Sequence, residues 1–225
     1  MNVIRIFGTA MIALAEIATQ ASAGDRMVVQ DFYLIYDLSE SSGIPKPDRT
    51  ILPEDHILLA TLLMEHPAVD TIVLSGDGGL NWPAEEMARK IEAFGLNTIA
   101  KNVCASACAT ILLAGRERSM QAGARVGFHR ASNDADYLRE LYIETKEQRG
   151  WIDEFAFATH VFERAQISAR NQIEYMIRRG VSADFALRTL TYGSMDMWFP
   201  TEAELLESGV LTRQPKTQQE EDETP

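Results

Sequence analysis

Residues 71–115 decide the fold, and they read TIVLSGDGGLNWPAEEMARKIEAFGLNTIAKNVCASACATILLAG. An apolar run of buried-strand type, from Asp70 to Ser75, leads into the turn GDGG and then into a helical pattern from Pro83 to Phe94. A second strand, Asn97 to Lys101, is followed by an apolar helix, Ser106 to Gly115. This alternation predicts right-handed crossovers and a mostly parallel sheet.

The same alternation extends to both sides of this stretch. The elements expected there are a strand at Met27 to Tyr36, a loop at Ser39 to Pro53, a helix at His56 to His66, and short strands at Ser119 to Met120 and Arg125 to Phe128. Beyond them, the pattern predicts two helices between Asp134 and Arg179 interrupted at Gly150, a helix at Glu202 to Glu207, and a final strand, GVLT, at 209–212.

Length and composition indicate one globular domain, residues 27–213. A chain of 225 residues that is 46% hydrophobic can bury one sizeable core. The formal net charge of −12, with scattered Lys and Arg, argues against nucleic-acid binding. Residues 214–225, QPKTQQEEDETP without apolar side chains, are expected to be a disordered acidic tail.

The first 23 residues have the features of a secretory signal peptide. Arg5 precedes an apolar stretch from Ile6 to Leu14, and residues 21–23 read ASA, the form of a signal peptidase site. We therefore expect a periplasmic or secreted protein that associates with a membrane only if this segment is not cleaved. An amphipathic N-terminal helix is the alternative, because Glu16 is a carboxylate beside the apolar stretch.

Ser106 lies where a predicted strand ends and an apolar helix begins, among small neighbours. A serine in this position is either an ordinary helix N-cap or a nucleophile beside free backbone amides. The amide of Ala107 would then face a developing oxyanion. Gly78 and Gly79, in the turn after the preceding strand, form either an ordinary tight turn or a second source of such amides.

His129 follows a short apolar strand, a suitable place for a general base, whereas the other three histidines fall in or beside predicted helices. The only two cysteines, Cys104 and Cys108, flank Ser106. In an exported protein they are expected to form a disulfide, which is feasible if Cys104 is extended; two buried free thiols are the alternative. No spacing of cysteines and histidines suggests a metal site.

The order GDGG, ASACATILLAG, VGFH and MDMWFPTEAELLESGVL resembles the ClpP-like serine peptidases of the ClpP/crotonase superfamily, over roughly Val28 to Leu211. The resemblance implies an α/β fold of repeated ββα and βαβ units with a mostly parallel sheet and flanking helices. It also implies Ser106 as nucleophile, His129 as base and Asp196 as orienting acid. Gly78, Gly79 and the Ala107 amide would form the oxyanion hole.

This resemblance implies a serine peptidase that hydrolyses polypeptides without a cofactor and assembles as a homo-oligomer, and the N-terminal segment adds that it is exported. Asp77 replaces the proline that usually precedes the paired glycines, and a carboxylate there opposes an oxyanion unless it points away. A catalytically silent protein that binds peptides is therefore an alternative. Acyl-CoA chemistry on the related crotonase scaffold is a third.

Overall fold

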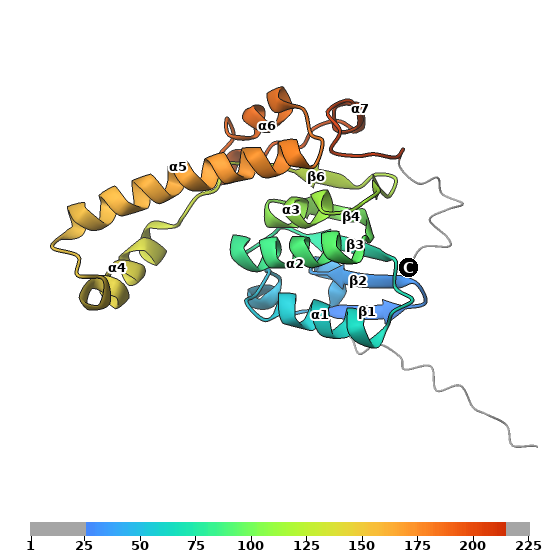
Figure 1. The fold of residues 1–225 in the computed structure, drawn as a ribbon, viewed down its shortest axis with the longest axis horizontal. Helices are drawn as coiled ribbons and strands as arrows, with labels where there is room; N and C mark the ends of the chain where they lie inside the picture. The colour runs from blue at the N-terminus through green and yellow to red at the C-terminus, as the bar shows by residue number, and fades with distance from the viewer. Residues whose placement is uncertain (1–25, 215–225) are drawn as a thin grey trace, which may run out of the picture.

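The computed structural model describes residues 26–214, which form one six-stranded sheet with flanking helices (Figure 1). The strands are β1 (Met27–Gln30), β2 (Tyr33–Asp37), β3 (Thr71–Gly76), β4 (Asn97–Ala105), β5 (Arg118–Met120) and β6 (Arg125–Gly127). Their order is β1-β2-β3-β4-β5, with β6 also paired to β4. Every pairing is parallel except that of β1 with β2, so the predicted mostly parallel sheet is confirmed.

Strand β4 pairs with two strands in succession along one edge. Its residues Thr98–Ala100 pair with β5, and Val103–Ala105 pair with β6. Between these two segments lies Asn102, whose φ of 53° is unusual for a residue other than glycine. The strand thus runs four residues past its predicted end at Lys101, and it delivers the chain directly to Ser106.

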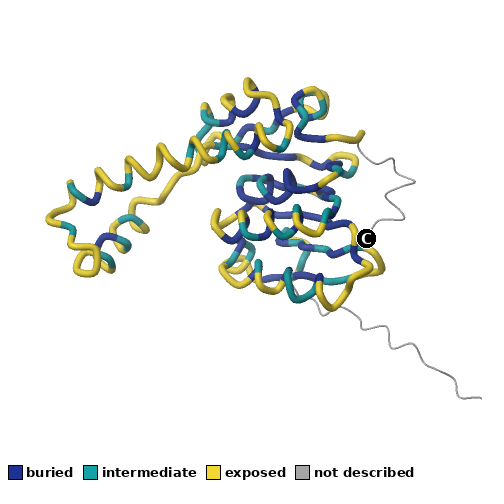
Figure 2. The backbone as a smooth tube through the Cα atoms, viewed as in Figure 1, coloured by how far each residue is buried: buried dark blue, intermediate teal, exposed yellow. Residues whose placement is uncertain are grey.

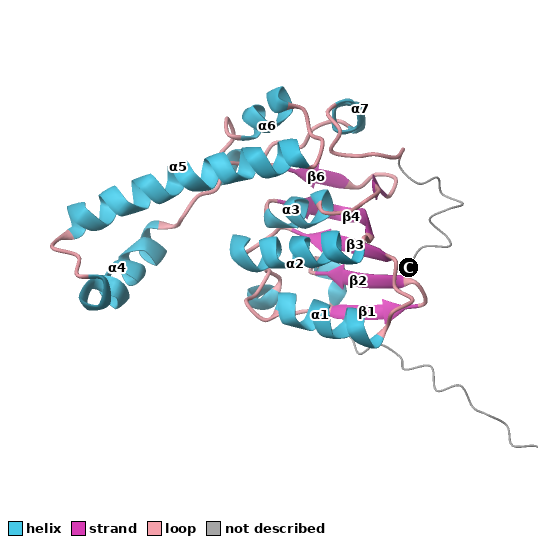
Figure 3. Cartoon of the chain, viewed as in Figure 1, coloured by secondary structure: helices cyan, strands magenta, loops and turns pink. Residues whose placement is uncertain are grey.

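Three helices cover one face of the sheet (Figure 3): α1 (Asp55–Glu65), α2 (Asn81–Phe94) and α3 (Ala107–Leu113). Strand β3 is buried along its whole length. Of the twelve largest fully buried side chains, eight come from the strands and from these helices: Leu34, Ile72, Leu74, Leu59, Met87, Ile91, Ile111 and Leu112. The hydrophobic core therefore lies between the sheet and α1–α3, where apolar area leaves water most completely.

Two further helices form an arm that projects from this body (Figure 1). They are α4 (Ala135–Arg149) and α5 (Glu154–Arg178), separated at Gly150 with φ 68°, as predicted. Figure 2 shows that α4 and the first half of α5 are mostly exposed. The second half of α5 packs on the body, where the Tyr175 hydroxyl donates to the Thr110 carbonyl over 3.2 Å.

The chain closes with α6 (Ala183–Thr189) and α7 (Glu202–Glu207), and the short helices η1 (Glu40–Ser42), η2 (Lys46–Asp48) and η3 (Ser194–Asp196) lie in loops. Helix α6 was not predicted. The predicted final strand at 209–212 is wrong, because these residues are not in a strand; the Thr212 amide instead donates to the Arg118 carbonyl over 2.9 Å.

The single strand predicted at Met27 to Tyr36 is in fact two. Asp31, with φ 53°, turns the chain back, so that β1 and β2 pair antiparallel. The predicted signal peptide, residues 1–23, and nearly all of the predicted tail lie outside the described residues. Within residues 26–214 no helix is long and apolar enough to cross a membrane.

A buried polar cluster holds the start of the described chain against the loop before α1. The Asp55 carboxylate is fully buried; it accepts hydrogen bonds from the Arg26 guanidinium at 2.6 and 2.7 Å, from the Tyr36 hydroxyl at 2.5 Å and from the Leu52 amide at 2.8 Å. Burial first, and the Asp55 carboxylate second, raise the pKa of Tyr36. This cluster fixes the segment next to Ile51, which pairs with the glycine turn.

A buried cation, Arg118, joins the ends of three helices. The Arg118 guanidinium donates to the carbonyls of Gly115, Arg179, Gly209 and Val210, at 2.7–3.2 Å. Burial, and next the nearby Arg179, lower the pKa of Arg118 to about 10. Since these carbonyls follow α3, α5 and α7, Arg118 links the C-terminal ends of those helices.

Candidate active site

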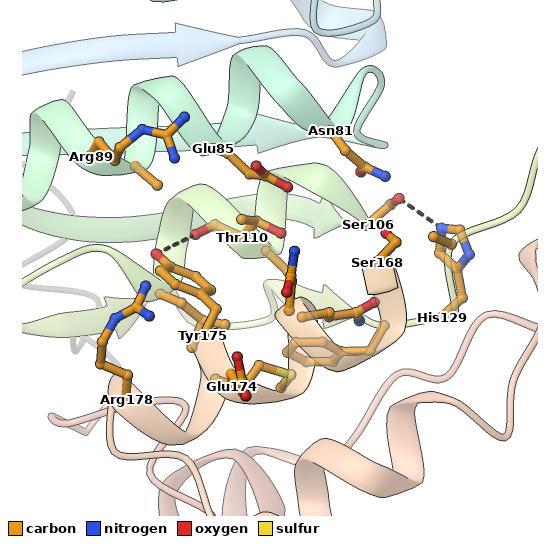
Figure 4. A pocket seen from close by; sticks show the side chains of 18 of the residues that line it. Asn81, Glu85, Arg89, Ser106, Thr110, His129, Ser168, Glu174, Tyr175 and Arg178 are labelled. Carbon is orange, nitrogen blue, oxygen red and sulfur yellow. Dashed lines mark hydrogen bonds between the residues drawn. The ribbon is translucent and has the colours of Figure 1, made fainter. Parts of the chain in front are cut away.

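Ser106 and His129 meet at the carboxyl end of β4, where the Ser106 Oγ lies 2.6 Å from the His129 Nε2 (Figure 4). Ser106 has φ 57° and ψ −124°, a strained conformation for a residue with a side chain. Its side chain caps no amide of α3. The interpretation of Ser106 as an ordinary N-cap is therefore wrong, and its hydroxyl is engaged by the imidazole.

The segment around Ser106 is fixed on both sides. A disulfide joins Cys104, at the end of β4, to Cys108, in the first turn of α3, with Cα atoms 5.2 Å apart. The predicted disulfide is thus confirmed. The Ser106 amide donates to the Gly127 carbonyl over 2.9 Å, which ties the serine to the end of β6, two residues before His129. The disulfide and the hydrogen bond to β6 together restrict the backbone of Ser106.

His129 is positioned by an aromatic cluster beneath it. Phe128 and Trp198 exchange two backbone hydrogen bonds, of 2.8 and 2.9 Å. The Phe128 ring packs edge-on against Phe185 of α6, with centroids 5.3 Å apart, and Phe185 lies 4.7 Å from Trp198. The buried Phe128 therefore anchors the backbone that carries the imidazole.

The hydrogen bonds of His129 assign its tautomer. Its Nδ1 lies 2.7 Å from the backbone carbonyl oxygen of Arg130. A carbonyl can only accept, so Nδ1 carries the proton and Nε2 is free to accept from the Ser106 hydroxyl. This is the protonation state that a general base requires before the serine attacks.

Asp196 is not brought to His129. It lies in η3 with an exposed side chain, and the hydrogen bonds of residues 26–214 include none between its carboxylate and the imidazole. The Arg130 carbonyl takes the place beside Nδ1 that an orienting acid would occupy. The role implied for Asp196 therefore stays a prediction.

The glycine turn lies directly against the serine. Ile51 forms hydrogen bonds with the residues on either side of Gly79. The Ile51 amide donates to the Gly78 carbonyl over 3.0 Å, and the Ile51 carbonyl accepts from the Leu80 amide over 3.2 Å. In an extended segment, the N–H of the intervening Gly79 points to the opposite side. Across residues 26–214, no hydrogen bond is donated by the amides of Gly78, Gly79 or Ala107, which leaves them available to a ligand.

No side chain fits at Gly78. Its φ is +106°, and an added Cβ would lie 2.8 Å from the Ser106 Cβ and 2.9 Å from the Ala107 nitrogen. The neighbouring Asp77 is exposed, and it does not line the cavity next to the serine. Its carboxylate is therefore hydrated, which weakens the opposition that it offers to a developing negative charge.

A cavity of about 420 Å³ begins at Ser106 and His129 and runs along α3 between α2 and α5 (Figure 4). Its apolar lining includes Ala88, Ala109, Leu113, Phe128 and Met176. Polar residues line it from two helices: Asn81, Glu85, Arg89 and Glu92 from α2, and Ser168, Asn171, Gln172, Glu174, Tyr175 and Arg178 from α5. A partly open space of this volume, with polar groups from two helices converging beside the serine, is a candidate binding site.

The α5 side of this cavity was not predicted from the sequence. Ser168, Asn171, Gln172 and Tyr175 recur at the i, i+3, i+4, i+7 spacing of one helical face, which was the available signal. That spacing shows that the residues share a face, but not which surface the face covers. No group of three or more His, Cys, Asp or Glu residues within 26–214 is arranged to hold a metal ion.

Comparison with known proteins identifies the fold. No protein-family model matches the sequence, and no curated protein matches it. Among solved structures, the chain is similar to a ClpP1 mutant from Listeria monocytogenes, with a TM-score of 0.51 and 16% identity over 76% of this chain and 89% of that one. It is also similar to a protein described as an enoyl-CoA hydratase from Streptomyces coelicolor A3(2).

That second similarity has the same TM-score of 0.51 and 16% identity, over 95% of this chain and 75% of the other. At this identity the two similarities establish the fold and not the activity. The chain therefore has the ClpP/crotonase fold, with a mostly parallel sheet and flanking helices.

Proposed function

We propose that this protein is a serine hydrolase that cleaves peptide bonds through an acyl-enzyme formed on Ser106. The observation that carries the proposal is the 2.6 Å contact between the Ser106 Oγ and the His129 Nε2 at one end of the cavity. A nucleophile and a base within hydrogen-bonding reach, with unpaired amides beside them, constitute the arrangement that acyl transfer requires.

The proposed reaction proceeds in two stages. His129 Nε2 takes the Ser106 proton as Oγ attacks the substrate carbonyl carbon, while the amides of Gly79 and Ala107 donate to the oxyanion. The imidazolium then protonates the leaving amine, which departs and leaves an ester on Ser106. Water, deprotonated by His129, releases the acyl group and restores the serine.

The Arg130 carbonyl would hold the His129 tautomer through both stages. Asp196, implied by the family resemblance, is the proposed acid for the same role if η3 rearranges to reach Nδ1. Stabilisation of the imidazolium by a carbonyl dipole is weaker than by a carboxylate, so this difference bears directly on the rate.

The test is labelling with a fluorophosphonate probe, which reacts with an activated serine. We expect Ser106 to be labelled, and labelling to disappear in Ser106→Ala and in His129→Ala. Ser194→Ala, an exposed serine outside the cavity, is the matched control and should label as the wild type does. Folded wild-type protein that does not label at all would overturn the proposal.

Hydrolysis of an unfolded polypeptide, measured with the same variants, separates the competing functions. A labelled protein that cleaves acyl-CoA thioesters and not peptides would favour the second candidate, for which the enoyl-CoA hydratase neighbour is the specific support. A protein that binds peptides without labelling or cleavage would favour the catalytically silent alternative. A wild type that is labelled and cleaves peptides, with both labelling and peptide cleavage lost in Ser106→Ala, is the outcome that supports a peptidase.

We also propose that the protein forms homo-oligomers through the helical arm. Large apolar side chains are exposed there, including Ile152 at 89%, Phe155 at 80% and Phe162 at 64%. Exposure of several large apolar side chains on one element is typical of an interaction surface. Sedimentation analysis of wild type and of Phe155→Glu tests this, because a monomeric wild type would contradict it.

Export to the periplasm or medium, through residues 1–23, is a further proposal that rests on the sequence alone. N-terminal sequencing of the protein purified from its own cells tests it. A mature chain starting near Gly24 supports export, and one starting at Met1 contradicts it.

A further inference from the structure

We infer that Asn81 is an additional catalytic residue, whose side-chain carboxamide donates a hydrogen bond to the oxyanion next to the amides of Gly79 and Ala107. The inference rests on the proposed function and deepens it. It arises from the structure, because in the sequence Asn81 lies between the turn GDGG and the helix expected from Pro83, and no motif there indicates a role for it.

The position of Asn81 follows from where α2 begins. The helix starts at Asn81, two residues after Gly79 and two residues before the start expected at Pro83. Asn81 lines the same cavity as Ser106 and His129. Figure 4 shows its carboxamide directed toward the Ser106 hydroxyl, whereas Glu85 and Arg89 lie progressively further along α2.

The Asn81 carboxamide is not used elsewhere. Among the interactions of residues 26–214, no hydrogen bond involves its side chain. Two other polar groups of the cavity are engaged, since the Tyr175 hydroxyl donates to the Thr110 carbonyl and the Arg89 guanidinium pairs with Glu86. Asn81 thus has two N–H donors free beside the nucleophile, and it cannot donate a proton outright as an acid would.

The backbone around Asn81 favours negative charge at the same place. As the first residue of a 14-residue helix, Asn81 lies at the positive end of the helix dipole, and the first turn of α2 contains no acidic residue. A neutral donor in this position is suited to a charge that appears only as the carbonyl is attacked. Such a donor stabilises the transition state more than it stabilises the bound substrate.

The chemistry that this residue supports is stabilisation of a tetrahedral oxyanion. Gly79 and Ala107 each contribute one backbone N–H, and the Asn81 side chain contributes a third donor that can follow the carbonyl oxygen as its geometry changes. Loss of one such donor typically lowers kcat by about 10²- to 10³-fold.

The experiment compares Asn81→Ala and Asn81→Asp with the wild type in hydrolysis of a chromogenic peptide. For Asn81→Ala we expect kcat to fall about 10²-fold or more, with KM changed by less than about threefold. Asn81→Asp preserves the side-chain shape but adds charge, and should be at least as slow. Asn97→Ala, at the opposite end of β4 and outside the cavity, is the control that should retain the wild-type kcat.

A second measurement excludes a purely structural effect. A peptide boronate forms a tetrahedral adduct on the serine, so its affinity should fall in Asn81→Ala by about the same factor as kcat/KM. Unchanged kcat and boronate affinity in a folded Asn81→Ala variant would overturn the role of Asn81. Absence of any Ser106-dependent turnover in the wild type would instead overturn the proposed function itself.

Discussion

The Ser106 hydroxyl donates to the His129 Nε2 over 2.6 Å, although the two residues are 23 positions apart. Strand pairing creates this contact, because Ala105 of β4 lies opposite Gly127 of β6. Each of these strands delivers its catalytic side chain within two residues of its end. The pairing of a three-residue strand is therefore what brings nucleophile and base together.

Asp196 can be tested against the Arg130 carbonyl as the group that orients His129. We expect Asp196→Asn to reduce peptide hydrolysis by less than about tenfold, because Nδ1 already has an acceptor. Loss of an essential orienting carboxylate lowers kcat by about 10⁴-fold. A loss of that size would establish that η3 rearranges to bring Asp196 to the imidazole.

Gly78→Ala should abolish activity through a collision with the nucleophile. The added methyl group would meet the Ser106 Cβ at 2.8 Å, so either the turn or the serine must move. Gly123→Ala is the matched control, since Gly123 also has a positive φ of 76° but has nothing within 4 Å of an added Cβ. The control should lose only about 1 kcal/mol of unfolding free energy and retain labelling. Equal labelling of both variants would contradict this explanation.

The disulfide should stabilise the protein and keep Ser106 in place. Removing a cross-link between residues four positions apart costs about 2 kcal/mol in the chain-entropy account. We expect the double variant Cys104→Ala, Cys108→Ala to show this loss in denaturant unfolding, together with slower probe labelling. Labelling at the wild-type rate would show that the strand pairing alone positions the serine.

Arg118→Met should be strongly destabilising. It removes the Arg118 donors of the Arg179, Gly209 and Val210 carbonyls, and leaves the Gly115 carbonyl with only its bond from Arg179. We expect a loss of about 3 kcal/mol or more in the free energy of unfolding. Arg116→Met, at an exposed arginine two residues earlier, should change it by less than about 0.5 kcal/mol.

The contribution of Tyr36 to stability should decrease at alkaline pH. Because burial and Asp55 raise its pKa, the folded state keeps the phenol proton at a pH where the unfolded chain, with a pKa of about 10, has released it. The folded state then binds more protons, so stability falls as pH rises above that value. The stability difference between wild type and Tyr36→Phe should narrow between about pH 9 and 11. A constant difference would contradict the shift.

The sequence predicted those parts of the fold that depend on local pattern. The alternation from Asp70 to Gly115 is strong because β3 is buried throughout and α3 is apolar, and both elements are present. The disulfide was predictable because an extended Cys104 followed by a helical Cys108 fits the required separation. The break between β1 and β2 was missed because Asp31 adopts a left-handed conformation, which an aspartate does not indicate as clearly as a glycine would.

The rest of the site depends on contacts that the sequence does not encode locally. The acceptor for Nδ1 is a backbone carbonyl, and every residue has one, so no residue type identifies it. Asn81 and the α5 lining acquire their positions only when helices distant in the chain pack around α3. The seven residues of α6, which support Phe128 through Phe185, are too few to give a clear helical period.

Helix α5 is one unbroken rod of 25 residues, about 37 Å long at 1.5 Å per residue. One end stands free of the body and the other walls the cavity beside Ser106. A helix of this length bends only gently. Any tilt of the end of α5 that lines the cavity therefore moves the outer end of the helix by a larger distance. Whatever restrains that outer end also fixes the width of the substrate space.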